Sequence, residues 1–134
     1  MPAIRTLEPF TRSLLRIVAG FTFSLHGMQK MLGLFGGMGG NGGKAAFGSL
    51  PWFAGSLEMI GGLLLILGLF TSPVAFILCG EMAVAYFKFH YPHGFLPNVN
   101  HGELAVLYCF IFLYLFAAGA GPLSLDSWVR KKPN

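Results

Sequence analysis

The chain has 134 residues, of which 54% are hydrophobic and only 10% are charged, with a formal net charge of +4. A soluble domain carries about 25% charged residues, whereas the mean hydropathy here is +0.66. So little charge cannot cover the surface of a soluble protein, and the composition predicts an integral membrane protein in contact with the lipid bilayer. We expect a single domain over residues 1–134, because the chain is too short for a second core.

The first predicted helix covers about residues 9–34. Pro9 suits a helix start, because its missing N–H needs no partner there. The apolar stretch contains Arg16 and lacks a small-residue cleavage site, so we expect it to be retained rather than removed as a signal peptide. Near its end, His26 and Lys30 are four residues apart and share one helix face, and Gln29 is adjacent.

A glycine-rich stretch, GLFGGMGGNGGKAAFGS at residues 33–49, follows this helix. It has no periodicity and predicts a flexible or re-entrant loop. It does not match the phosphate-binding pattern G-x-x-x-x-G-K-[ST], because Ala45 follows Lys44.

Three further helices are predicted at about residues 52–70, 73–91 and 101–119. The second is long enough to cross the roughly 30 Å hydrocarbon core. The connection Thr71-Ser72-Pro73 is so short that the second and third helices must be antiparallel neighbours, and Ser72 is a candidate cap. Pro92 ends the third helix. The predicted fold is an all-α four-helix transmembrane bundle with up-down-up-down topology.

The basic residues predict the orientation of this bundle. Both termini lie on one side, which also holds the largest group of positive charges: Arg5, Arg12, Arg16, Arg130, Lys131 and Lys132. The opposite side holds Lys30, Lys44 and Lys88. The positive-inside rule therefore predicts a multi-pass protein of the cell's inner (plasma) membrane with both termini cytoplasmic. A nucleic-acid partner is disfavoured, because the charges bracket apolar sequence and no reading module is present.

Two carboxylates within the apolar runs, Glu58 and Glu81, are the candidate catalytic groups. An unpaired charge in an apolar environment is costly, and ionisable residues at membrane depth generally serve a function. Glu58 could pair with Lys30, and Glu81 with Lys88, which lies seven residues on and so on nearly the same face of a regular helix. The other reading is proton exchange or ligand binding in a cavity.

The candidate ligand-binding residues form a polar cluster in the half of the bundle away from the termini: His26, Gln29, Lys30, Lys88, Asn100 and Glu103. His26 and Lys30 could hydrogen-bond a quinone carbonyl. Asn100 and Glu103 also fit a capping box at the start of the fourth helix. Tyr108 is a further candidate lining residue.

The histidines and cysteines give weaker signals. His90, His93 and His101 could bind a metal with His26 or Glu103, but Pro92 interrupts the helix between the first two. Haem would need an axial ligand in addition to His26. Metal and haem are therefore disfavoured, and the cofactor remains open, with a quinone as the candidate. Cys79 and Cys109 have no C-x-x-C spacing and are interpreted as small buried apolar side chains. A disulfide between neighbouring helices is the alternative, which nothing in the sequence supports.

Four stretches together resemble one family of small membrane proteins, the DoxX family: RIVAGFTFSLHGMQK, SLEMIGGLLLILGLFT, GEMAVAYFKFH and NHGELAVLYCFIFLYLFAAGAGPLSLD. The resemblance implies four transmembrane helices. Some relatives are subunits of thiosulfate:quinone oxidoreductases or partners in thiol and redox-stress complexes. By resemblance, polar positions of the family correspond to His26, Lys30, Glu58, Glu81, Asn100 and Glu103. The glycine-rich loop is longer than is typical of the family.

Two functions follow as hypotheses. The first is a redox-linked membrane protein whose pocket binds a quinone or another small redox molecule. Its electrons would come from a partner protein or the substrate, because no flavin or iron–sulfur motif is present. The second is a non-catalytic scaffold or transporter-like subunit that docks a partner protein. A homodimer, through glycine-lined helix faces, fits either hypothesis.

Overall fold

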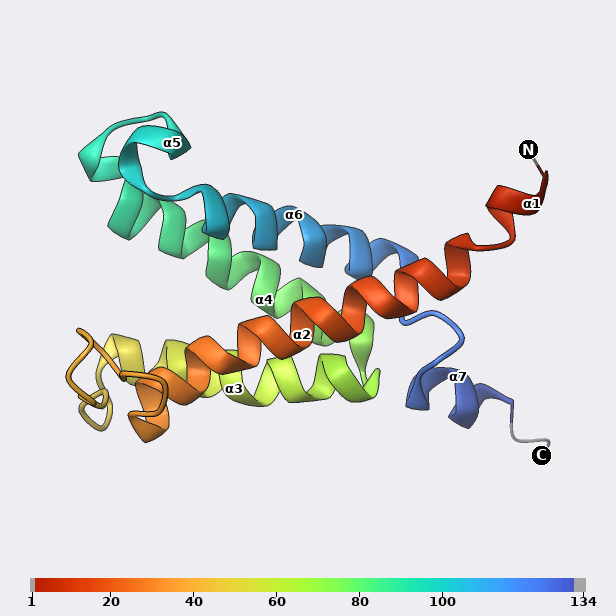
Figure 1. Cartoon of the computed structure of the whole chain (residues 1–134), viewed down its shortest axis with the longest axis horizontal. Helices are drawn as coiled ribbons and strands as arrows, with labels where there is room; N and C mark the ends of the chain where they lie inside the picture. Colours follow the sequence, from red (N-terminus) through yellow and green to blue (C-terminus); the bar gives the residue numbers. More distant parts are fainter. Residues whose placement is uncertain (1, 132–134) are drawn as a thin grey trace.

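The computed structural model describes residues 2–131, and within that range it is helical and contains no β-strand (Figure 1). The four long helices are α2 (Glu8–Leu32), α3 (Leu50–Leu67), α4 (Thr71–Ala85) and α6 (Glu103–Ala118). The short elements are α1 (Pro2–Arg5), η1 (Tyr86–His90), η2 (Tyr91–His93), α5 (Pro97–Asn100) and α7 (Leu125–Arg130). The prediction of an all-helical fold is confirmed for this part of the chain.

Local sequence signals account for the ends of α2 and α3. Helix α2 stops at Gly33, whose φ of 70° suits glycine in the left-handed region. Ser49 caps α3, because its side-chain oxygen accepts a hydrogen bond from the N–H of Trp52 at 3.3 Å. Helix α3 ends at Gly68, with φ of 67°. The connection before α4 is therefore short, as expected from the sequence.

The residue that caps the start of α4 is not the one expected from the sequence. Ser72 does not cap the helix, because α4 begins one residue earlier, at Thr71. The carboxylate of Asp126, from α7, instead accepts hydrogen bonds from the N–H groups of Phe70 at 2.8 Å and Thr71 at 2.9 Å. A negative charge at this end of a helix also complements its dipole. The C-terminal segment thus holds the α3–α4 turn.

The end of the third predicted helix is not regular α-helix. After Ala85 the chain forms a π-helical turn, η1, in which the N–H of Tyr91 bonds to the carbonyl of Tyr86. Each π turn holds an additional residue, so the side chains beyond it are rotated relative to a continuous α-helix. The turn changes which residues of this segment face inward.

The long helices form two closely packed pairs, α2 with α3 and α4 with α6. Gly27 permits the closest approach within the first pair, because a Cβ there would lie 2.3 Å from the backbone nitrogen of Met59. Successive long helices run in opposite directions in Figure 1. Helices α1 and α7 lie at one end of the molecule, and α5 lies at the other end with the glycine-rich loop.

The interior and the outer surface are both apolar. The buried core is made of residues from all four long helices, among them Phe23, Leu65, Leu78, Phe112 and Leu115. Large apolar side chains are also exposed on every long helix, for example Phe21 (53%), Ile60 (56%), Phe76 (61%) and Phe110 (63%). By length and composition, two helical stretches could cross a membrane, Leu50–Leu67 and Thr71–His93, and Glu103–Ala118 is a shorter apolar helix. An apolar exterior of this kind suits lipid better than water.

Candidate functional site

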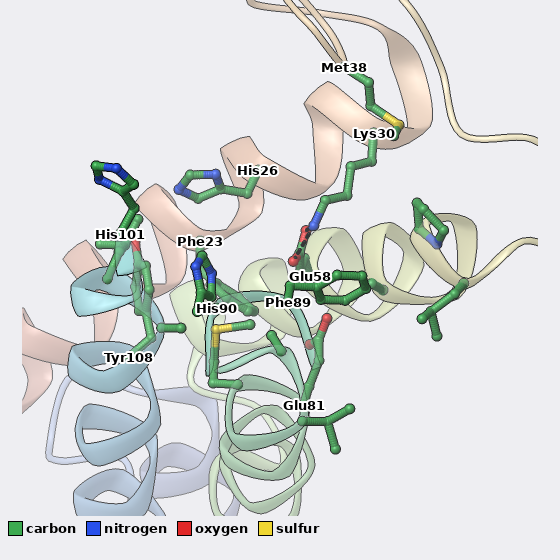
Figure 2. A pocket seen from close by; sticks show the side chains of 18 residues that line it. Phe23, His26, Lys30, Met38, Glu58, Glu81, Phe89, His90, His101 and Tyr108 are labelled. Atoms are coloured by element: carbon green, nitrogen blue, oxygen red, sulfur yellow. Dashed lines mark hydrogen bonds and ion pairs between the residues drawn. The ribbon is translucent and has the colours of Figure 1, made fainter. Parts of the chain in front are cut away.

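A cavity of about 420 Å³ lies where the two helix pairs diverge, at the end of the molecule that carries the glycine-rich loop (Figures 1 and 2). Its walls come from α2, α3, α4, η1 and α6, and Met38 of the glycine-rich loop also contributes. The labelled lining residues in Figure 2 are Phe23, His26, Lys30, Met38, Glu58, Glu81, Phe89, His90, His101 and Tyr108. The cavity therefore combines apolar walls with a small number of ionisable groups, which is typical of small-molecule sites.

An ion pair between Lys30 and Glu58 forms one side of the cavity. The Nζ atom of Lys30 lies 2.6 Å from Oε1 and 2.8 Å from Oε2 of Glu58. Glu58 is only 3% exposed, whereas the Lys30 side chain is 30% exposed. Gly55, one turn before Glu58, allows this approach, because a Cβ there would lie 2.8 Å from Cβ of Lys30. This confirms the pairing of Lys30 with Glu58 that the sequence offered as one of two readings.

Glu81 is a cavity residue whose buried carboxyl group has no hydrogen-bond partner within residues 2–131. Both of its carboxylate oxygens are buried and make no hydrogen bond. Its carboxyl group points from α4 toward the Lys30–Glu58 pair (Figure 2). A buried carboxyl group without a hydrogen bond is costly, so Glu81 does not stabilise the bundle through hydrogen bonds among the described residues.

The expected pair of Glu81 with Lys88 is wrong. Lys88 is exposed, and Glu81 forms no ion pair with it. The physical reason is the π turn, which begins at Tyr86 and breaks the α-helical repeat between the two residues. Phe89 and His90, which follow Lys88, line the cavity instead.

Aromatic and histidine side chains complete the cavity. The ring of His26 lies 6.4 Å from that of Tyr108, edge to face. The Tyr108 hydroxyl donates a hydrogen bond of 2.6 Å to Oγ1 of Thr22, so it is held by α2. Nδ1 of His90 is 3.1 Å from the carbonyl oxygen of Asn100, and His90 also lines the cavity.

Four of the predicted site residues line this cavity: His26, Lys30, Glu58 and Glu81. The other four do not: Gln29, Lys88, Asn100 and Glu103. The Gln29 side chain donates to the carbonyl of Phe35 and so holds the glycine-rich loop. Glu103 is exposed and borders a second, shallower hollow of about 350 Å³ with His101 and Leu107.

Asn100 is buried but has a structural role. Its Nδ2 donates to the Tyr86 hydroxyl at 3.2 Å and to the Gly94 carbonyl at 2.7 Å, and its Oδ1 accepts from the N–H of Gly102 at 2.8 Å. The expected capping box with Glu103 is wrong, because α6 begins after Gly102 and has no side-chain cap. Asn100 instead shapes the η2–α5 segment, which carries His101.

Sequence reasoning missed several residues that matter here. Met38 and Phe89 carry no chemical signal in the sequence, because both belong to apolar or glycine-rich runs. His90 is considered in the sequence only as a disfavoured metal ligand and is not among the candidate ligand-binding residues, yet it lines the cavity. Within residues 2–131 no group of three His, Cys, Asp or Glu residues is arranged to hold a metal ion.

A second polar centre lies at the opposite end of the bundle, around Arg16. Its side chain is fully buried. Nε donates to Ala120 at 2.8 Å and Nη1 to Ile66 at 2.9 Å. Further hydrogen bonds reach the carbonyls of Leu65 and Leu123. The guanidinium thus satisfies the carbonyls at the end of α3 and in the chain after α6, and its role is structural.

Comparisons with known proteins identify the family. The sequence model of the DoxX family matches residues 11–91. An uncharacterized protein of Haemophilus influenzae is 44% identical over 136 residues, which cover 98% of this chain and 100% of that protein. A protein of Bacillus subtilis with the printed name "Putative oxidoreductase CatD" is 27% identical over 118 residues, 88% of this chain and 86% of its own. No solved structure matches the chain. The chain belongs to the DoxX family of membrane proteins.

Proposed function

We propose that the cavity binds a quinone or another small redox molecule, and that Glu81 exchanges protons with the bound molecule. The observation that carries the proposal is the position of Glu81, whose two buried oxygens lack a partner in the part of the chain described. A quinone takes up two electrons and two protons when it is reduced, and a protonatable carboxyl group next to its carbonyl oxygen can deliver a proton.

The walls of the cavity suit such a ligand. Phe23, Phe89 and Tyr108 offer flat apolar surfaces for a ring, and Lys30 and His26 offer donors for its oxygen atoms. The electrons would come from a redox partner protein. The relative whose printed name contains "oxidoreductase" supports redox chemistry in this family.

We further propose that α2, α3, α4 with η1, and α6 each cross the cell's inner membrane, in alternating directions. The apolar side chains exposed on all four helices support this arrangement. The end of the molecule with α1 and α7 holds Arg5, Arg12, Arg16, Arg130 and Lys131. By the positive-inside rule this end would face the cytoplasm, and the cavity would lie in the outer half of the membrane.

The alternative is a non-catalytic scaffold whose polar residues only hold helices together. The Lys30–Glu58 pair favours that role for these two residues, because it joins α2 to α3. A purely structural role, however, does not account for Glu81, whose buried carboxyl group makes no hydrogen bond among the described residues. Glu81 therefore favours the ligand-binding function.

Binding of a short-chain quinone analogue to the full chain in lipid nanodiscs tests the proposal. Ala54 lines the cavity and is partly buried, so Ala54→Trp should fill it and weaken binding about tenfold or more, equivalent to about 1.4 kcal/mol. Ala117 is exposed on α6 outside the cavity, and Ala117→Trp is the matched control. Equal binding by the wild type and both variants would refute a quinone site in this cavity, and native mass spectrometry would then show whether another molecule co-purifies.

A further inference from the structure

Cys79 and Cys109 lie side by side in the structure, although 30 positions separate them in the sequence. Their Sγ atoms are 3.6 Å apart, across the contact between α4 and α6. The Cys109 thiol also reaches the carbonyl oxygen of Cys79, at 3.5 Å. Both cysteines are free, and both are only partly buried. The interpretation of the two residues as small buried apolar side chains is therefore incomplete, and the alternative of a link between neighbouring helices gains a structural basis.

We propose that Cys79 and Cys109 are a redox-active dithiol that forms a reversible disulfide between α4 and α6. A disulfide has an S–S bond of about 2.05 Å, so the sulfur atoms must approach by only about 1.5 Å. The two helices are already among the most closely packed in the molecule, so rotation of the two side chains and a small adjustment of the helices supply this movement.

The surroundings of the pair define the class of oxidant. The outer faces of α4 and α6 are apolar, with Phe76 and Phe110 exposed near the two cysteines. Gly80 follows Cys79 and is exposed, and apart from its chain neighbours and the nearby backbone of α4, no described atom lies within 4 Å of the position that a Cβ would occupy there. A small apolar disulfide dissolved in the membrane can reach these thiols, whereas a charged one is excluded by the apolar surface.

The Cys79–Cys109 disulfide would form in two thiol–disulfide exchange steps, in which atoms and electrons balance. One cysteine sulfur attacks the disulfide oxidant and forms a mixed disulfide, and one small thiol leaves. The second cysteine sulfur then attacks the cysteine sulfur of the mixed disulfide, forms the Cys79–Cys109 bond and releases the second small thiol. The chain loses two electrons and two protons, and the oxidant gains them.

The dithiol is a separate site from the cavity proposed to bind a quinone, because neither cysteine lines that cavity. It is nevertheless close to the cavity in sequence: Glu81 follows Cys79 by two residues, and Tyr108 precedes Cys109. The bridge would join the two helices that carry these cavity residues. Oxidation would thereby hold one wall of the cavity together.

Titration of the reduced full chain with dithiodipyridine, an apolar disulfide that releases a coloured thiol, tests the proposal. The wild type should release two equivalents of thiopyridone and lose two hydrogen atoms in mass, without retaining an adduct. Cys79→Ser and Cys109→Ser should each release one equivalent and keep one thiopyridine group. The double serine variant should release none, and dithiothreitol should restore the wild-type mass.

Three outcomes would overturn the proposal. In the first, the wild type retains two thiopyridine groups, which shows that the sulfurs react independently. In the second, only one thiol reacts, and in the third neither does. Because the double serine variant retains every cavity residue, its quinone binding should equal that of the wild type. A failed titration with intact quinone binding would thus reject the dithiol alone.

Discussion

The Lys30 ammonium group bridges both carboxylate oxygens of Glu58, at 2.6 Å and 2.8 Å, and so ties the last turn of α2 to the middle of α3. Glu58 is almost fully buried, and no other side chain is hydrogen-bonded to it among the described residues. The stability of this helix pair and the charge of the cavity therefore depend on the same contact.

Replacing Lys30 by Met should destabilise the protein by about 3 kcal/mol, because it leaves a buried carboxylate without its partner. The double variant Lys30→Met, Glu58→Gln should recover part of this loss, since no charge is then buried. Free energies of unfolding of the wild type, both single variants and the double variant give the coupling energy. A coupling energy near zero would show that the pair contributes nothing beyond its separate side chains.

Glu81→Gln should leave the fold and its stability unchanged to within about 1 kcal/mol, because the carboxyl group makes no hydrogen bond that could be lost. Proton-coupled reduction of a bound quinone should be abolished, since an amide does not titrate. Thermal unfolding and quinone reduction with a supplied reductant provide the two measurements. Wild-type turnover in this variant would remove Glu81 from the mechanism.

Arg16→Lys should destabilise the protein by about 3 kcal/mol, although the charge is preserved. A lysine ammonium cannot reach all the carbonyls that the planar guanidinium now binds, and a buried carbonyl without a donor costs about 1–3 kcal/mol. Arg5 is exposed, and Arg5→Lys is the matched control, with an expected effect within about 0.5 kcal/mol. Equal unfolding temperatures of the two variants would contradict the structural role of Arg16.

Gly27→Ala should separate α2 from α3, because the added Cβ would lie 2.3 Å from Met59 N and 2.7 Å from Gly55 O. Backbone atoms cannot move aside as a flexible side chain can, so the expected loss is about 3 kcal/mol. Gly80→Ala is the control: it has open space and should stabilise α4 by up to about 1 kcal/mol. Thermal unfolding of the two variants in the same nanodiscs compares them. If Gly27→Ala unfolds no earlier than Gly80→Ala, the close contact does not exist in the membrane.

Much of the secondary structure is evident from the sequence, because its signals are local. Apolar runs interrupted by Pro and Gly predict four long helices, and glycine at positions 33 and 68 accounts for the ends of α2 and α3. The pairing of Lys30 with Glu58 is one of two pairings that the sequence offers, because few ionisable groups exist in these helices and an unpaired charge in an apolar setting is costly. The same argument suggests Glu81 with Lys88, which does not form.

Other features could not be predicted, because they depend on contacts between distant segments. The π turn at Tyr86–His90 cannot be seen in the hydrophobic pattern, and it places His90 at the cavity and Lys88 outside it. Asp126 caps α4 from more than 50 residues away, at 2.8 Å and 2.9 Å from its two N–H partners. Neither the π turn nor the Asp126 cap can be predicted from the spacing of nearby residues.

The sequence by itself determined the helical class, the apolar exterior and the small set of ionisable residues available for chemistry, since these follow from composition and short-range periodicity. Only the tertiary structure decided which of them meet. The packing and register of the helices leave Glu81 unpaired at the cavity, bury Arg16 among backbone carbonyls and bring the sulfurs of Cys79 and Cys109 to 3.6 Å. These contacts depend on how whole helices pack against one another, which is a property of the assembled bundle rather than of any one segment.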